Sequence, residues 1–327
     1  MALYLVTGGA GFIGSHLVHA LVARGDRVRV LDDLSTGTRD NLRGLEVGAL
    51  DSDSPVELHV ASITDADACR SACRGVRGVL HEAAQVSVPR SVEDPRASYA
   101  VNVTGTLNLL EAAREHAVRK FVFAASSAAY GDSVELPKRE DMLPTPLSPY
   151  ASGKIAAEHL LQVFGRVYGL QTVALRYFNV FGPRQLDDSP YTGVIALFAR
   201  ALLEGRRPTI FGDGQQTRDF TYIDNVVDAN LAALDRELET GLVINVGSGE
   251  RISVLALFAR MAELLESDLT PIHAPARAGD VRDSLASLDL ARRHLSYAPR
   301  VHWRDGLATT VEWYRARHGH PVRSARR

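Results

Sequence analysis

The sequence lacks several features that would mark a special class of protein. Only two of its 327 residues are cysteine, and the spacing of Cys69 and Cys73 fits neither a CxxC motif nor a disulfide framework. No apolar run is long enough to span a bilayer. The chain also enters a predicted strand at once, which leaves no room for a signal peptide. We therefore expect a cytoplasmic protein with no membrane partner and no metal site.

An excess of charge of one sign is also missing. The chain has 37 Lys and Arg against 39 Asp and Glu, a formal net charge of −2. Such a balance leaves no electrostatic footprint for nucleic acid or for an acidic membrane surface. We interpret the one basic cluster, Arg323, Arg326 and Arg327, as a frayed tail. With 46% hydrophobic residues, the chain is long enough for one large or two ordinary domains.

The first 33 residues contain the unit around which the chain is organised. It reads as a strand, a glycine-rich turn, a helix, a second strand and an acid: Leu3–Thr7, Gly8–Gly14, Ser15–Arg24, Arg27–Leu31 and Asp32. Gly8, Gly11 and Gly14 suit a tight turn, close approach to a pyrophosphate, and close packing of helix on strand. The helix N-terminus would then present free N–H groups to the phosphates.

Asp32 at the end of the second strand predicts which dinucleotide binds. Its carboxylate would accept hydrogen bonds from the adenosine ribose, and it would repel the 2′-phosphate of NADP, so NAD is favoured. The alternative is an ordinary βαβ turn with incidental glycines. The context of strand, turn and helix, with an acid about 20 residues on, favours dinucleotide binding.

The rest of the chain continues the alternation of strands and helices. We predict strands at residues 56–60, 79–81, 120–125 and 172–177, helices at 65–74, 98–116 and 149–167, and a surface excursion at 44–55. This order predicts an α/β fold with a doubly wound parallel sheet, a Rossmann domain, over residues 1–180 with a probable return near 220–247. Residues 181–327 contain frequent Gly and Pro between helices predicted at 194–203, 225–234, 254–265 and 303–317. We read them as a second, smaller α/β domain for the substrate.

Tyr150 and Lys154 are the strongest candidates for catalysis. They lie four residues apart in the first turns of a predicted helix and so share one face. A neighbouring ammonium and a positively charged nicotinamide would lower the pKa of the tyrosine, which could then take a proton from a sugar hydroxyl. Ser126, at the end of a strand, could relay that proton, and Lys154 could hold the nicotinamide ribose. The alternative is an ordinary exposed Tyr and Lys.

These motifs together resemble the extended short-chain dehydrogenase/reductase family over nearly the whole chain. Within it, the NAD-dependent nucleotide-sugar epimerases are the most similar, specifically the UDP-glucose and UDP-N-acetylglucosamine 4-epimerases. The segments that carry the resemblance are Gly8–Gly14, Ala125–Gly131, Ser148–Lys154, Arg176–Asn179, Arg218–Phe220 and Arg277–Asp280. The resemblance also implies a homodimer through the helices at 98–116 and 149–167.

The resemblance assigns further residues to the two ligands. For NAD it adds Phe12, Ile13, Ser62, Ile63, Ala83, Ala84, Asn102 and Tyr177. For the UDP-sugar it implies Ser87, Ser127, Asn179, Val194, Arg218, Arg277 and Ser284. Guanidinium groups suit a diphosphate because their forked donors match its oxygens. One position departs from the family, since many members carry Asp-Ile where this chain has Ser62 and Ile63, which weakens the expected adenine contact.

The implied reaction is the interconversion of C4 epimers of a UDP-hexose through a 4-keto sugar, with NAD retained. Related dehydratases and decarboxylases need carboxylates just after the catalytic serine, where this chain has Ser127 and Ala128, so both are disfavoured. Ser284 stands where members restricted to non-acetylated sugars have a tyrosine, which predicts that N-acetylated sugars are accepted as well. A UDP-glucuronate 4-epimerase and a non-catalytic NAD-sensing protein remain open.

Overall fold

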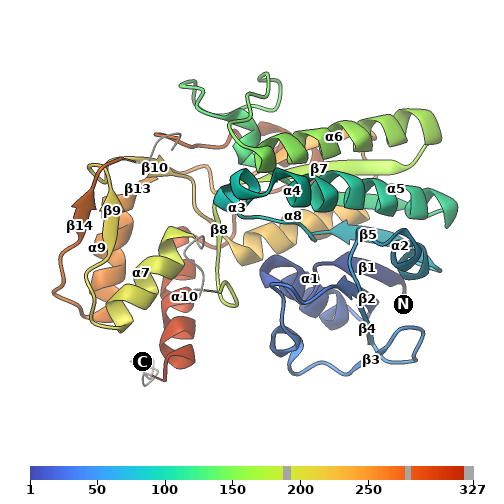
Figure 1. Cartoon of the computed structure of the whole chain (residues 1–327), viewed down its shortest axis with the longest axis horizontal. Helices are drawn as coiled ribbons and strands as arrows, with labels where there is room; N and C mark the ends of the chain where they lie inside the picture. The colour runs from blue at the N-terminus through green and yellow to red at the C-terminus, as the bar shows by residue number, and fades with distance from the viewer. Residues whose placement is uncertain (187–192, 277–280, 320–327) are drawn as a thin grey trace.

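An eight-stranded parallel sheet dominates the computed structural model, which describes residues 1–186, 193–276 and 281–319 (Figure 1). The strand order is β12-β7-β6-β5-β1-β2-β4-β3. The strands are β1 Leu3–Thr7, β2 Arg27–Asp32, β3 Val47–Ala49, β4 Val56–Val60, β5 Gly78–His81, β6 Lys120–Ser126, β7 Gln171–Tyr177 and β12 Leu242–Val246. The order reverses direction between β1 and β5, which is where open α/β sheets bind ligands.

Helices cover both faces of this sheet, as the doubly wound prediction requires. One face carries α1 (Phe12–Ala23) and α8 (Ile223–Asp235), and the other carries α2 (Ala66–Cys73), α5 (Thr106–Glu115) and α6 (Pro149–Tyr168). Successive strand residues point to opposite faces. In β5, accordingly, Val79 belongs to the core beneath α2, α5 and α6, and Leu80 to the core beneath α1 and α8. The predicted fold class is confirmed.

The structure differs from the sequence-based expectations in one helix boundary and in several short elements. Helix α1 begins at Phe12 with Gly11 as its N-cap, rather than at Ser15. The region at 44–55 is not only an excursion, because β3 within it pairs with β4 in parallel. Residues 39–42 and 127–130 form 3₁₀ turns, which we did not predict.

The long helix predicted at 98–116 is not uniform. Short helices α3 (Val88–Glu93) and α4 (Pro95–Tyr99) come first, and a π-helical turn at Ala100–Gly105 leads into α5. The hydroxyl of Thr106 donates to the carbonyl of Asn102, 2.8 Å away. It therefore competes with the backbone N–H groups for that acceptor, which gives a physical reason for the local widening.

The remaining described elements lie at one end of the sheet, to its left in Figure 1. The helices are α7 Val194–Leu203, α9 Val254–Leu265, α10 Trp303–Arg317 and a π-helical turn at Ala291–Leu295. Three two-stranded pairs join β8 (Val180–Phe181) to β11 (Thr221–Tyr222), β9 (Thr209–Phe211) to β14 (Ile272–Ala274), and β10 (Thr217–Arg218) to β13 (Ile252–Ser253). The chain returns to the sheet at β12, which pairs with β7. In the described part of the chain, no helix is long and apolar enough to cross a membrane.

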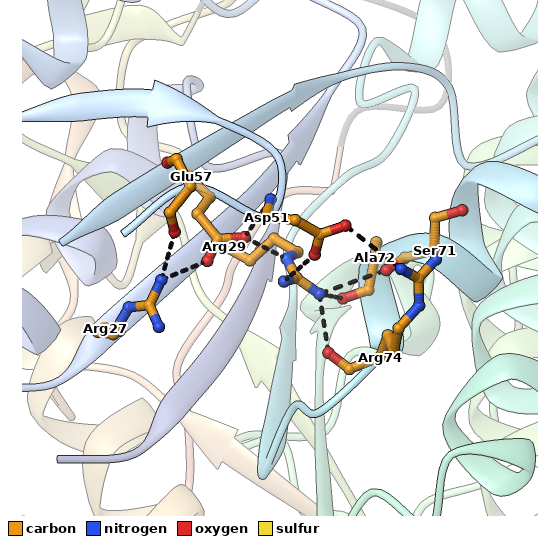
Figure 2. A network of polar contacts seen from close by, with 8 residues as sticks. Arg27, Arg29, Asp51, Glu57, Ser71, Ala72 and Arg74 are labelled. Atoms are coloured by element: carbon orange, nitrogen blue, oxygen red, sulfur yellow. Dashed lines mark hydrogen bonds and ion pairs between the residues drawn. The ribbon is translucent and has the colours of Figure 1, made fainter. Parts of the chain in front are cut away.

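An ion-pair network with a buried pair at its centre connects β2 and β4 to α2, as Figure 2 shows. Glu57 on β4 accepts from Arg29 at 2.7 Å and from Arg27 at 2.8 Å. The Arg29 and Glu57 side chains are only 4% and 2% exposed. Arg29 also donates to the carbonyls of Ala72 and Arg74 at the end of α2, where a cation complements the helix dipole.

Because Glu57 is buried between two guanidinium groups, replacing its charge should be costly. We expect Glu57→Gln to lower the free energy of unfolding by about 3 kcal/mol, since it leaves a buried cation without its main partner. Urea denaturation monitored by circular dichroism would measure the change. Asp40→Asn removes the same charge from an exposed pair with Arg43 and should cost less than about 0.5 kcal/mol. Equal costs would contradict a stabilising role for the buried pair.

Candidate active site

The glycine-rich turn brings the ends of β1 and β5 into close contact. Gly8 has a φ of +66°, and a Cβ placed there would lie 2.8 Å from the backbone nitrogen of Ala83. A Cβ on Gly14 would lie 2.2 Å from the carbonyl oxygen of Gly8. Neither position can hold a larger residue without moving the backbone. The turn therefore packs against the neighbouring backbone as closely as the motif predicts.

The start of α1 has the donors that a pyrophosphate needs. Gly11 is the N-cap, and within the described residues no side chain caps this end of the helix. The first-turn N–H groups of Phe12, Ile13 and Gly14 therefore lack a capping side chain, at the point where the sheet order reverses. This arrangement fits the diphosphate of a dinucleotide.

Asp32 fixes the same turn from the neighbouring strand. Its two carboxylate oxygens accept from the backbone nitrogens of Ala10 and Leu34, each at 2.9 Å. Burial raises the pKa of Asp32. Each oxygen keeps a lone pair for a further donor, so the residue retains the capacity to accept from ribose hydroxyls. The donor set at α1 and the acceptor at Asp32 together fit NAD.

The predicted adenine side is formed by the loop after β4. The hydroxyl of Ser62 lies 2.9 Å from that of Thr64, and Ile63 is buried with its carbonyl accepting from Asn108. Ala84 follows β5 and is partly exposed. Contacts of these residues with a cofactor remain predictions.

A directed chain of hydrogen bonds holds the loop after β5, and the sequence analysis missed it. Thr106 donates to the Asn102 carbonyl, so its oxygen accepts from Nε2 of His81 at 3.0 Å. Nδ1 of His81 is then the acceptor for the Thr7 hydroxyl at 2.7 Å, and Thr7 accepts from the backbone nitrogen of Ala83. The imidazole is therefore held neutral, and burial lowers its pKa to about 3.

Asn102 completes this support. Its side-chain oxygen accepts from the backbone nitrogen of Gln85 at 2.9 Å, and its nitrogen donates to the Gln85 carbonyl at 3.0 Å. The implied contact of Asn102 with the cofactor stays a prediction. In the protein alone its amide holds the loop after β5 through the backbone of Gln85.

The depressed pKa of His81 predicts a dependence of stability on pH. Its folded pKa lies below the ordinary value of 6.5, so its contribution is full above pH 6.5 and is lost as the pH falls toward 3. Between pH 7 and pH 5, wild type should lose about 2 kcal/mol more free energy of unfolding than His81→Gln. Only in wild type does unfolding release a neutral imidazole that then takes up a proton. Urea titrations at the two pH values measure this difference. Equal losses in both proteins would show that His81 is not held neutral.

The N-terminus of α6 brings Tyr150 and Lys154 to the sheet. The Ser148 hydroxyl accepts from the backbone nitrogen of Ala151 as the N-cap, and Pro149 occupies the first turn, as predicted. The Lys154 ammonium is buried, donates to the Ala124 carbonyl at 2.8 Å, and lies 6.0 Å from the centre of the Tyr150 ring. The structure therefore brings these two residues together near the end of β6, whose last residue is Ser126.

The pKa of Tyr150 differs from our expectation. Burial raises it, a hydrogen bond from Ser126 lowers it in part, and the charge of Glu82 raises it further. The Lys154 ammonium donates to the Ala124 carbonyl, and burial lowers the pKa of Lys154 itself to about 8. The predicted lowering by the neighbouring ammonium was wrong for the protein alone, so only the positive nicotinamide remains as a source of it.

Glu82, which we did not single out, is the unexpected member of this site. Its carboxylate accepts from the Tyr177 hydroxyl at 2.8 Å, and that hydroxyl also contacts Asn230 of α8. Burial raises the pKa of Glu82 to about 7, against the charge of Lys154. An acid directly after a buried strand, at the ligand edge of the sheet, was the sequence signal. The predicted contact of Tyr177 with NAD is not tested by these bonds.

A cavity beside β8 and α7 collects several of the predicted substrate residues. It encloses about 270 Å³ and is lined in part by Asn179, Val194, Phe211, Gln216 and Arg218. Arg218 donates to the carbonyls of Thr217 and Arg282. An arginine at the edge of a cavity lined by both polar and apolar side chains can contact a base and its phosphates together.

The other predicted substrate residues do not line this cavity or lie outside the described residues. The backbone nitrogen of Ser284 donates to the Thr217 carbonyl, next to Arg218, and Ser284 is 8% exposed. Ser87 is the N-cap of α3, and Ser127 begins the turn after β6. Arg277 lies outside the described residues.

A Tyr-x-x-x-Lys pair at the edge of a Rossmann sheet defines an enzyme of the short-chain dehydrogenase/reductase class. Within that class, the chain belongs to the NAD dependent epimerase/dehydratase family, whose model matches residues 4–247.

Individual relatives cover almost all of the chain. It is 43% identical to a UDP-glucose 4-epimerase of Mycolicibacterium smegmatis, over 95% of this chain and 98% of that protein. A UDP-N-acetylglucosamine 4-epimerase of Methanobrevibacter ruminantium, solved with UDP-N-acetylmuramic acid, is 36% identical with a TM-score of 0.90, covering 97% and 99% of the two chains. A UDP-glucose 4-epimerase of Thermus thermophilus, solved with NAD, is 40% identical with a TM-score of 0.84, covering 96% and 99%.

Proposed function

We propose that this protein is a UDP-sugar 4-epimerase that retains NAD. The observation that carries the proposal is that Ser126, Tyr150 and Lys154 lie together at the end of β6 and the start of α6, in a chain similar to 4-epimerases over nearly its whole length. NAD, when bound, would accept a hydride from the sugar carbon C4 and return it.

The chain's own residues provide the proton chemistry and the anchoring. Tyr150 takes the proton of the C4 hydroxyl, and Ser126 forms a hydrogen bond with the phenol oxygen of Tyr150. Lys154 holds the nicotinamide ribose. Arg218 and Arg277 bind the diphosphate. The 4-keto sugar can therefore rotate in the pocket while UDP stays bound. Most of the binding energy then lies on UDP, and the hexose is held loosely.

Tyr150→Phe tests the acid–base assignment. The ring and its packing remain while the hydroxyl is lost, so UDP-sugar binding should persist and turnover should fall by about 10²–10⁴-fold. Tyr99→Phe is a matched control, because it removes a phenol hydroxyl that bonds Ser152 on the same helix α6. A Tyr150→Phe rate close to that of Tyr99→Phe would remove Tyr150 from the mechanism.

Substrate size is the next part of the proposal, and it depends on Ser284. This residue is almost fully buried and its backbone pairs with β10, next to Arg218 of the cavity. A hexose that turns over must move its C2 substituent past the pocket wall, and a serine leaves room for an acetamido group. We therefore assign both UDP-N-acetylglucosamine with UDP-N-acetylgalactosamine and UDP-glucose with UDP-galactose as substrates.

Ser284→Tyr should separate the two substrate pairs. The added ring overpacks the pocket by about 1–3 kcal/mol, enough to cut the rate on the N-acetylated pair by one or two decades while largely sparing the other pair. Ser284→Ala keeps the position small and should retain both activities. Product ratios from chromatography give the result, and an equal loss of both activities in Ser284→Tyr would show that the residue does not gate the pocket.

The assembly and compartment form a further part of the proposal. We assign a homodimer in which the α5 and α6 faces pack together, because α6 exposes Val163, Val167 and Tyr168. We also assign the protein to the cytoplasm, consistent with two free, buried cysteines. Analytical ultracentrifugation of wild type and Val167→Asp distinguishes a dimer formed by this face from a monomer.

The function itself is tested by incubating the purified protein with a panel of UDP-sugars and no added NAD. Conversion of glucose-type to galactose-type sugars supports the proposal, and conversion of UDP-glucuronate alone would replace it with a uronate epimerase. Bound NAD without conversion of any sugar would point to a sensor instead.

A further inference from the structure

Glu82 is a charged residue near the reacting groups that the mechanism above does not use. Glu82 directly follows β5. The neighbouring strand β6 ends at Ser126. Its backbone forms part of the close contact with Gly8, because a Cβ on Gly8 would lie 3.1 Å from the Glu82 carbonyl carbon. The residue as a whole is partly exposed, while its carboxyl group is buried. Glu82 therefore lies where the two halves of the sheet meet at the cofactor turn.

The hydrogen-bond partners of Glu82 suit two protonation states. With Glu82 ionised, the Tyr177 hydroxyl donates to its carboxylate at 2.8 Å, and Asn230 donates to the Tyr177 oxygen at 2.8 Å. With Glu82 protonated, its own hydroxyl donates to the Tyr177 oxygen. The Tyr177 hydroxyl then turns to the Asn230 side-chain oxygen, 3.0 Å away. Rotation of one hydroxyl keeps the bond between Glu82 and Tyr177 in both forms, and Tyr177 donates to the Asn230 side-chain oxygen only when Glu82 is protonated.

The charges that face Glu82 come from a few elements. Helix α6 contributes Lys154, whose ammonium favours the ionised form, and Tyr150, whose pKa Glu82 raises. Strand β7 contributes Tyr177, and α8 contributes the neutral Asn230. His81, the preceding residue, is neutral at pH 7 because its pKa is about 3. The balance of these groups puts the pKa of Glu82 at about 7, so a change of one nearby charge can alter its ionisation.

We propose that Glu82 is a proton-accepting residue whose carboxylate is ionised when the bound nicotinamide is oxidised and takes one proton from water when the nicotinamide is reduced. Only an O–H bond on Glu82 is made, and the proton returns to water on reoxidation. The oxidised ring is a cation and the reduced ring is neutral, so reduction removes a charge that favours the carboxylate. The inference rests on the proposed function only in requiring NAD with its ring near Tyr150.

The direct test is infrared difference spectroscopy of the protein loaded with NADH minus the protein loaded with NAD⁺ at pH 7, without sugar. We expect a band of a protonated carboxyl group in the NADH state. It should be absent in Glu82→Gln, which keeps the side-chain size and an acceptor for Tyr177. It should persist in Asp33→Asn, which alters an exposed carboxylate beside the adenosine end. No band in wild type, or an unchanged band in Glu82→Gln, overturns the proposal.

A partition experiment counts the proton independently. Because Tyr150 can also bind a proton, the experiment uses two proteins that lack its hydroxyl: Tyr150→Phe, and Tyr150→Phe combined with Glu82→Gln. Each protein is equilibrated with a fixed NADH/NAD⁺ mixture at several pH values between 6 and 8. With Glu82 present, the bound NADH/NAD⁺ ratio should rise by up to tenfold for each unit the pH falls. With Glu82→Gln it should not change. A flat ratio in both proteins contradicts the proposal.

Tyr177→Phe gives a second variant that does not depend on the behaviour of Glu82→Gln. Its hydroxyl lowers the pKa of Glu82, so in the same Tyr150→Phe background the pH range of the partition effect should move upward when that hydroxyl is lost. An unmoved range would contradict the assigned network. Because none of these measurements uses a sugar, failure of the epimerase assay and failure of the Glu82 proposal are separate results.

Discussion

The structure depends on the close contact of two backbone segments, the Gly8 turn after β1 and Ala83 after β5. No side chain fits between them, since a Cβ on Gly8 would lie 2.8 Å from the Ala83 nitrogen. This contact lies where the order of the sheet reverses, so it places the α1 N-terminus, Asp32 and the loop after β5 around one point. The hydrogen bonds through Thr7, His81 and Asn102 then hold the β5 loop in position.

Several titratable side chains lie near that point, and their burial in the protein disfavours their charged forms. Burial raises the pKa of Tyr150 and of Glu82, and lowers that of Lys154. The positive nicotinamide would favour the ionised forms of Tyr150 and Glu82. The site is therefore completed electrostatically by its cofactor, which is consistent with a protein that keeps NAD bound through each cycle.

Much of this could be predicted from the sequence because the signals are local. The glycine spacing, the acid at Asp32 and the Ser148–Lys154 segment each describe a short stretch whose conformation and neighbours are set by adjacent residues. The same reasoning placed most of the helices to within a few residues, as the early start of α1 at Phe12 shows, but it merged α4, a π-helical turn and α5 into one helix at 98–116.

What could not be predicted depends on partners far apart in the sequence. The π-helical turn arises from a hydroxyl bond between Thr106 and the Asn102 carbonyl, which no helical pattern reveals. The direction of the Tyr150 pKa shift depends on burial and on Glu82, 68 positions away in the chain. Lys154 was correctly placed beside Tyr150, but its ammonium bonds the Ala124 carbonyl, a contact that spacing within one helix cannot show.

The central claim is that C4 of the sugar is oxidised and that the same hydrogen returns to it within one binding event. It is tested most directly by incubating the purified protein, without added NAD, with a UDP-hexose that carries deuterium at C4, and by analysing the recovered epimers by mass spectrometry and NMR. The account predicts that the product epimer retains the deuterium at C4 in full. Loss of deuterium to water during conversion, or its appearance at another carbon, would contradict it.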